Sequence, residues 1–350
     1  MKKRFFAFLL ATFAICCMTA CSQKETGNVE QGMAAIEEMN YDEALQYFQI
    51  AEEAGETSVE LYRGKGIALM GQIRYEEALD AFALALKQGG SIPKDIDYDI
   101  NYYIAVCYYK LGRFDEALER YNAILALKPK AIDAYVQRGT VYLKLNQYTE
   151  AMADFDYAIS LDKKNYSLYI DIYGILKEND HAKDGESYLQ AAMDSNDKNM
   201  SNFDKGRMYF YLENYTYARN FFEQARNSVA NNKKEELFLL LGQSYEKLND
   251  LPYASTIYLG YLEENESAAI YNQLGMCYFA QGLYQDAYNA FESGVKLGAS
   301  DCKQELMFNR VVACEYLGDF KKASTLVEEY MKAFPDDENA KREYQFLQTR

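Results

Sequence analysis

Few side chains in this sequence have the types and spacing that catalysis requires. The single histidine is His181, which falls in a predicted turn. Nucleophilic or acid–base catalysis needs a base placed beside a nucleophile and an orienting group. The chain contains no G-x-S-x-G, phosphate-binding loop or H-E-x-x-H motif. We interpret His181 as a surface histidine and predict that the protein is not an enzyme. One enzymatic hypothesis stays open, because two carboxylates about 5 to 10 Å apart suffice for glycoside hydrolysis.

Two further patterns bear on metals and cofactors. The run Asp95-Ile96-Asp97-Tyr98-Asp99 is similar to the start of a calcium-binding loop, but no glycine follows the third Asp and Val106 stands where the terminal Glu belongs. An acidic loop that leads into a helix N-terminus explains the run better. Gly64 and Gly66 lie inside a helical pattern, which indicates helix packing rather than a nucleotide site. We predict no metal site and no cofactor.

Cys21 is the residue whose position suggests a covalent modification. Residues 2–4 are basic, and residues 5–18 form an uncharged, mostly apolar run. As a helix this run would be about 21 Å long, short of the roughly 30 Å that a bilayer core needs. A short apolar run behind basic residues is typical of a secretion signal. The run ends at 18–22 in Met-Thr-Ala-Cys-Ser, which resembles the bacterial lipobox.

That resemblance implies a lipoprotein signal peptide over residues 1–20 and an acylated, palmitate-type Cys21 at the start of a polar tether, 21–27. It also implies attachment to the extracytoplasmic face of the cell membrane, or a place in the periplasm or outer membrane of a host with two membranes. Ordinary cleavage after Ala20 and an uncleaved anchor are the alternatives. The formal charge of −16 becomes −19 without the three basic residues at 2–4. This charge repels nucleic acids and anionic headgroups, so the lipid must hold the protein at the membrane.

The elements that would position any site are repeated helices. Four prolines, no tryptophan and thirty-three tyrosines favour an all-helical chain. One small residue recurs every 33 to 39 positions, as Ala44, Ala78, Ala117, Ala151, Gly185, Ala218, Ala254, Ala287 and Ala323. A near-constant period of this size is typical of stacked-repeat folds.

The flanks of this residue repeat too. Twelve positions before it stands a small residue, at Gly32, Gly66, Ala105, Gly139, Gly206, Gly242 and Gly275. Three before it is usually an aromatic, and four after it is a large apolar residue such as Phe48, Phe82 or Phe155. Residues four and seven apart share one helix face, so each unit predicts two amphipathic helices joined by a turn.

These residues and spacings resemble the tetratricopeptide repeat (TPR) family. The resemblance implies an all-α, right-handed α-solenoid of about nine helix-turn-helix repeats over residues 28–335, with a C-terminal capping helix in 336–350. The fifth repeat departs from the pattern, since Gly174 is eleven before Gly185 and Lys177, His181 and Asp184 replace apolar residues. There the sequence predicts poor packing or a bend.

The family also implies that the first helix of each repeat lines a concave groove that binds a peptide or protein. The candidate groove residues are Tyr102, Tyr109, Phe203, Arg207, Phe210, Tyr211, Asn272, Phe279 and Phe308. The alternative is that these side chains pack between neighbouring repeats. The expected function is a non-enzymatic interaction scaffold of the bacterial cell envelope. A second hypothesis is an envelope chaperone or a docking and assembly factor for a secretion or pilus system. The partner's identity is not readable from the sequence.

Overall fold

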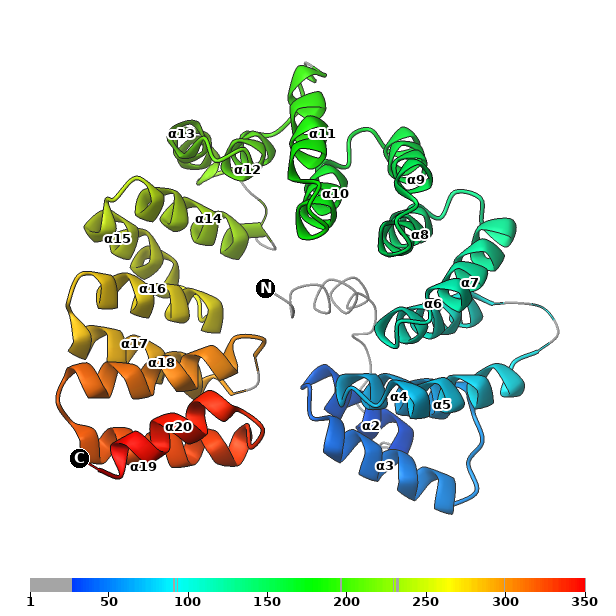
Figure 1. The fold of residues 1–350 in the computed structure, drawn as a ribbon, viewed down its shortest axis with the longest axis horizontal. Helices are drawn as coiled ribbons and strands as arrows, with labels where there is room; N and C mark the ends of the chain where they lie inside the picture. The colour runs from blue at the N-terminus through cyan, green and yellow to red at the C-terminus, as the bar shows by residue number, and fades with distance from the viewer. Residues whose placement is uncertain are drawn as a thin grey trace. The chain divides into compact units, whose positions relative to one another are not determined.

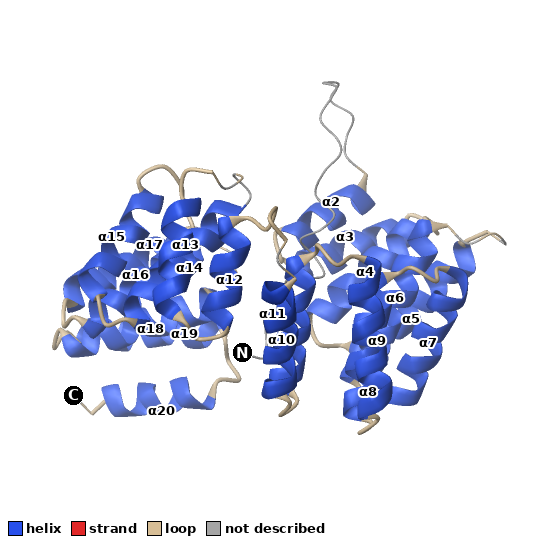
Figure 2. Cartoon of the chain, turned by 90° about the horizontal axis from the view of Figure 1, so that it is seen from above, coloured by secondary structure: helices blue, strands red, loops and turns tan. Residues whose placement is uncertain are grey.

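The computed structural model describes residues 27–90, 92, 94–195, 197–228, 230, 233–298 and 300–349. Over this part of the chain the secondary structure is helical throughout, with nineteen α-helices and no strand (Figure 2). The all-α prediction is therefore confirmed. The predicted signal peptide (1–20), Cys21 and most of the tether lie outside the described residues.

The described chain divides into two compact units, of which the N-terminal one ends at Ala192. Its helices are drawn from blue to green in Figure 1 and each packs against the next. They are α2 (Asn28–Glu37), α3 (Tyr41–Glu53), α4 (Val59–Gly71), α5 (Tyr75–Gln88), α6 (Asp95–Lys110), α7 (Phe114–Leu127), α8 (Ile132–Lys144), α9 (Tyr148–Leu161), α10 (Tyr166–Glu178) and α11 (Ala182–Asp194). These ten helices form the first five repeats, and the first helix α4 also contacts the first helices α2 and α6.

The C-terminal unit begins at Met193 and holds the last four repeats. Its helices are α12 (Asn202–Tyr211), α13 (Tyr215–Ala225), α14 (Lys234–Lys247), α15 (Leu251–Leu262), α16 (Ala268–Ala280), α17 (Tyr284–Lys296), α18 (Lys303–Tyr316), α19 (Phe320–Ala333) and α20 (Glu338–Leu347). Here too the first helices α12, α14, α16 and α18 contact one another in sequence order. The helices thus match the nine predicted repeats and the predicted final helix.

The turn inside each repeat has one residue with a left-handed backbone. It lies five positions before the small residue that recurs in every repeat (Ala44 in the first, Gly185 in the fifth), and its φ is between 58° and 76°. The nine residues are Met39, Ile73, Gly112, Asn146, Asp180, Glu213, Asn249, Gly282 and Gly318. In the third repeat this geometry lets the Arg113 amide donate to the carbonyl of Tyr108 at 2.8 Å, which closes the helix end. Only three of the nine positions use glycine, so the other six carry the steric cost of a side chain there.

The two helices of most repeats meet at a glycine that faces an aromatic ring. A Cβ added to Gly66 on α4 would lie 2.4 Å from the ring of Phe82 on α5. The same arrangement joins Gly139 to Phe155, and the rings of Phe82 and Phe155 are fully buried. The remaining pairs of this kind are Gly32 with Phe48, Gly206 with Phe222, Gly242 with Tyr258 and Gly275 with Phe291. The small residue is therefore needed because the ring occupies the space of its side chain.

The fifth repeat departs from this arrangement, and the expected poor packing or bend there stays a prediction. Helix α10 buries eight of its residues, among them Tyr173. Tyr173 stands twelve before Gly185, where other repeats carry the small residue. A Cβ on Gly185 would lie 3.0 Å from the Tyr173 Cα, whereas a Cβ on Gly174 would meet nothing within 4 Å. Tyr173 thus takes the place of the small residue on the first helix, Gly185 takes the place of the repeated alanine, and the fully buried Leu189 takes the place of the ring.

Candidate functional site

The predicted groove residues of the N-terminal unit are two tyrosines of α6. Tyr102 and Tyr109 are both half-buried. The Tyr102 ring lies 6.1 Å from that of Tyr121, and the Tyr109 ring lies 5.6 Å from that of Phe114. Burial and the nearby Asp133 carboxylate raise the pKa of Tyr102 above its ordinary value. These rings pack inside the third repeat and expose only part of their surface.

Two predicted groove residues of α12 belong to the protein interior. Phe203 is 3% exposed and Arg207 is 5% exposed. Phe203 packs in the core of the sixth repeat, 6.1 Å from the ring of Phe222. The Arg207 guanidinium forms an ion pair with Glu236 of the next first helix at 2.8 Å. The alternative of packing between repeats therefore holds for both residues, and neither is open to a ligand in this structure.

The five other groove candidates of the C-terminal unit are half-buried. Phe210 on α12 meets Tyr211 and Tyr215 edge-on, at 5.6 and 5.5 Å between ring centres. Asn272 on α16 accepts a hydrogen bond from the Asn309 side chain on α18 at 3.0 Å. Phe308 packs against Tyr330 at 5.5 Å. Their binding role stays a prediction.

Phe279 leads to a surface feature that the sequence did not reveal. Its ring lies 4.7 Å from Tyr316 and 5.2 Å from Tyr284, and those two tyrosines are 4.9 Å apart. Three further exposed apolar residues lie beside this trio in the chain or on its helices. We call the whole set the aromatic patch, and it consists of Met276, Phe279, Leu283, Tyr284, Tyr316 and Leu317.

Four of the six side chains in the aromatic patch are exposed to solvent. Tyr316 is 58% exposed, and Met276, Leu283 and Leu317 are each between 41% and 45% exposed. Exposed apolar side chains gathered near an aromatic cluster are typical of binding sites. The positions of Tyr284 and Phe279 in the repeat were visible in the sequence. Their contact with Tyr316 depends on the packing of α16 against α18, which the repeat pattern does not specify.

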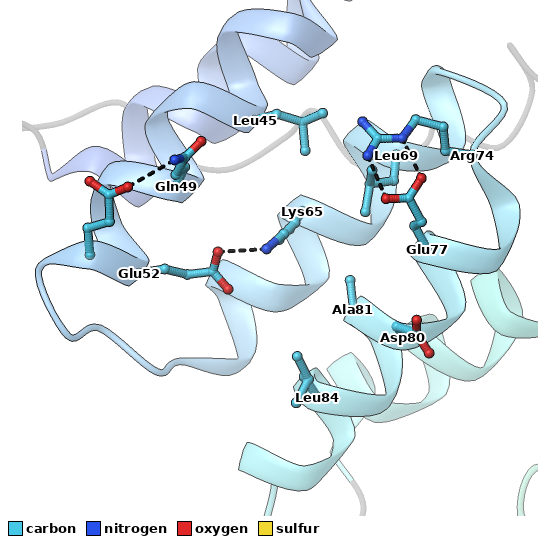
Figure 3. A pocket seen from close by; sticks show the side chains of 11 residues that line it. Leu45, Gln49, Glu52, Lys65, Leu69, Arg74, Glu77, Asp80, Ala81 and Leu84 are labelled. Atoms are coloured by element: carbon cyan, nitrogen blue, oxygen red, sulfur yellow. Dashed lines mark hydrogen bonds and ion pairs between the residues drawn. The ribbon is translucent and has the colours of Figure 1, made fainter.

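A second feature is an open hollow of about 700 Å³ in the N-terminal unit, lined by α3, α4, α5 and the turn residue Arg74 (Figure 3). Buried Leu69 and Ala81 contribute to its apolar surface. Two ion pairs lie across it, Lys65 with Glu52 and Arg74 with Glu77, each at 2.6 Å. The second helices α3 and α5 contribute to the lining of this hollow. None of the predicted groove residues lies in that lining.

Two carboxylates of this hollow, Glu52 and Glu77, are engaged in ion pairs. The hydrogen bond from Arg74 holds the pKa of Glu77 below its ordinary value, whereas a general acid needs a raised one. Glu52 is tied to Lys65, and the remaining carboxylates, Glu53 and Asp80, are exposed to water. The hollow therefore gives no support to the glycosidase hypothesis.

The acidic run at the start of α6 is used for helix capping and ion pairs. Asp97 accepts a hydrogen bond from the Lys94 amide at 2.7 Å, Asp95 pairs with Lys128 at 2.8 Å, and Asp99 pairs with Arg63 at 2.5 Å. Among the described residues no group of three or more potential metal ligands occurs. His181 is about 40% exposed and stacks on Tyr148, as expected for a surface histidine.

Within the part of the chain that the structure describes, no helix has both the length and the apolar character needed to cross a lipid bilayer.

Comparison with known families finds tetratricopeptide repeats in both units. Models described as tetratricopeptide repeat match residues 29–93, 132–165 and 268–298, and a further TPR repeat model matches 107–146. Two of the matched segments, 132–165 and 268–298, each coincide with one helix pair of the structure.

Individual relatives share only short stretches with this chain. Sperm-associated antigen 1 of Rattus norvegicus is 40% identical over 52 residues, which are 15% of this chain and 6% of that protein. The peptidyl-prolyl cis-trans isomerase PASTICCINO1 of Arabidopsis thaliana is 29% identical over 76 residues, 22% of this chain and 12% of that protein. The chain thus spans only a small part of the length of either relative.

Among solved structures, a tetratricopeptide repeat protein from Parabacteroides merdae is similar with a TM-score of 0.43 and 19% identity. The match covers 82% of this chain and 97% of that one.

Proposed function

Because the chain belongs to the tetratricopeptide repeat family, whose members generally bind proteins or peptides, we propose that it is a non-enzymatic interaction scaffold of the bacterial cell envelope. A lipid on Cys21 would hold it at the extracytoplasmic side of a membrane. The aromatic patch of the C-terminal unit is the observation that best supports this binding role.

The patch has the chemistry of a binding hot spot. Tyrosine, phenylalanine and methionine supply large contact areas, and tyrosine also offers a polar hydroxyl at its tip. The Tyr316 side chain is the most exposed member, while Phe279 and Tyr284 support it from α16 and α17. A partner that buries the patch gains hydrophobic free energy without reorganising the repeat.

Site-specific photocross-linking tests this proposal. A photoreactive phenylalanine analogue at position 316 should give discrete cross-linked products in intact cells. The matched control is Tyr217 on α13, which is 53% exposed in the same unit but not in the patch. Equal product patterns from both positions, or none from position 316, would contradict the proposal.

The lipid anchor is tested separately. Cys21→Ser removes the only sulfur that the lipobox resemblance assigns to acylation. The variant should move from the membrane fraction to the soluble fraction while its helical circular dichroism is unchanged. A variant that stays in the membrane fraction would argue for an uncleaved anchor instead.

The exposed apolar character of the patch also favours one alternative, an envelope chaperone or a docking and assembly factor for a secretion or pilus system. Unfolded clients expose apolar segments that could bind Tyr316 and Leu283. Stable, stoichiometric co-purification with one partner would support the scaffold. Transient cross-links to many different proteins would support the chaperone.

A further inference from the structure

The hollow of the N-terminal unit has more negative than positive side chains in its lining. The charged lining residues are Glu52, Glu53, Glu77, Asp80, Lys65 and Arg74. Both cations are already paired inside the hollow, Lys65 with Glu52 and Arg74 with both carboxylate oxygens of Glu77 (Figure 3). Glu53 and Asp80 are exposed and form no ion pair with any described residue. These two carboxylates are therefore open to a positively charged ligand.

The end of helix α3 adds to this negative charge. Glu52 and Glu53 are its last two residues, and the last turn of α3 contains no basic residue. The C-terminus of a helix is the negative end of its dipole, where cations are favourable and carboxylates are not. Two glutamates at this place act against the stability of α3, and residues that break a local rule in this way are expected at functional sites. A cation bound beside Glu53 would relieve the repulsion.

The carboxylates are spread along the hollow rather than gathered around one point. Among the described residues no three potential metal ligands lie close enough together to hold an ion. This spacing suits several positive charges carried along a peptide better than a single metal ion. The hollow also offers apolar carbon, because Leu45 is half-buried and Leu84 is 41% exposed, beside the buried Leu69 and Ala81. A ligand that matches both features combines positive charge with apolar side chains.

We propose that the hollow binds a basic amphipathic segment of a partner protein. Lysine or arginine side chains of this segment lie beside Glu53 and Asp80, and an apolar side chain packs on Leu84. The volume of about 700 Å³ is within the roughly 300–1,000 Å³ of clefts that hold ligands. Amphipathic segments bind hollows of this kind through their apolar face. The inference does not rest on the aromatic patch, which belongs to the other compact unit.

Fluorescence anisotropy with a defined peptide tests the proposal on the purified full chain. The probe is a short labelled peptide with leucines on one helix face and lysines on the other. It should bind saturably, and its affinity should fall as the salt concentration rises, because exposed charges are screened. A second peptide with serines in place of the leucines should bind more weakly, since it buries less apolar surface. Absence of saturable binding, or equal binding of both peptides, would overturn the proposal.

Two double variants decide whether the carboxylates of the hollow are responsible. Glu53→Gln with Asp80→Asn should weaken binding of the leucine–lysine peptide by about tenfold, as expected for two exposed ion pairs. The matched control is Glu119→Gln with Glu186→Gln, which removes the same charge from exposed positions of the same unit outside the hollow. It should change the affinity by less than about twofold. Equal losses in both double variants would indicate general charge attraction and overturn the proposal.

The apolar contact has its own variant and control. Leu84→Ser should weaken binding by about fivefold, because it removes the exposed apolar side chain of the hollow. Leu127→Ser changes a leucine that is 61% exposed on α7, outside the hollow, and should leave the affinity unchanged. Sedimentation velocity tests another occupant. A wild-type dimer that dissociates in the variant with Glu53→Gln and Asp80→Asn would identify a second copy of this chain and refute the proposed partner.

Discussion

The fourth and fifth repeats place their large side chains differently where their two helices meet. In the fourth, Gly139 on the first helix receives the fully buried ring of Phe155 from the second. In the fifth, Tyr173 stands where Gly139 does, and the fully buried Leu189 stands where Phe155 does. In this comparison the glycine on the first helix accompanies a ring on the second, and without that glycine a smaller side chain takes the place of the ring.

The largest effect should come from removing the ring of the regular repeat. Phe155→Ala should lower the free energy of unfolding by about 3–5 kcal/mol, because it leaves a cavity beside a glycine that cannot fill it. Leu189→Ala in the fifth repeat deletes fewer atoms and should cost less. Denaturant titration followed by circular dichroism measures both changes. Equal losses would mean that the two crossings are packed with similar side-chain volume.

A smaller effect, with opposite signs in the two repeats, should come from adding a methyl group. Gly139→Ala places a Cβ 2.6 Å from the Phe155 ring, so it should cost about 1–3 kcal/mol. Gly174→Ala in α10 meets no atom within 4 Å and should stabilise the helix by about 0.5–1 kcal/mol. The same denaturant titration gives both values. A destabilising Gly174→Ala would show that the fifth repeat is tighter than its structure indicates.

Effects as small as that of Gly174→Ala should arise at the left-handed turn residues. Ile73, a β-branched residue, has φ of 65° in the second repeat, and Asp180 has the same φ in the fifth. Ile73→Gly should raise stability by about 1 kcal/mol, since glycine adopts this backbone without steric cost. Asp180→Gly should gain less, because aspartate tolerates the left-handed region better. Thermal melts of the two variants test this order, and a larger gain for Asp180→Gly would contradict it.

The fold could be predicted because the repeat pattern depends on local spacing. Ala151, Gly139 and Phe155 have fixed separations within one helix pair, and the small repeat residue recurs nine times, once for each pair. In the fifth repeat the small residue of the first helix was sought near position 173 and found at Gly174. The combination of Tyr173 with Leu189 at the ring position is visible only when both positions are compared for volume.

The candidate site was less predictable, since exposure depends on contacts between repeats. Phe203 and Phe279 were both placed in the groove by the family pattern. The first is buried against Phe222, while the second supports Tyr316 on the surface. The hollow beside Lys65 was missed because the second helices α3 and α5 supply most of its lining, and the groove argument considered first helices alone.

The packing of each helix mainly against its neighbours in the chain has a consequence for folding kinetics. The helix pairs with the most extensive contacts, such as α4 with α5 and α16 with α17, are consecutive in sequence. Such local pairing gives a low contact order, so little chain entropy is lost before the first contacts form. Folding can therefore start at any well-packed repeat and spread to both sides. Among the possible starting points, the fourth repeat, with Phe155 seated on Gly139, is better suited than the end repeat that α20 covers.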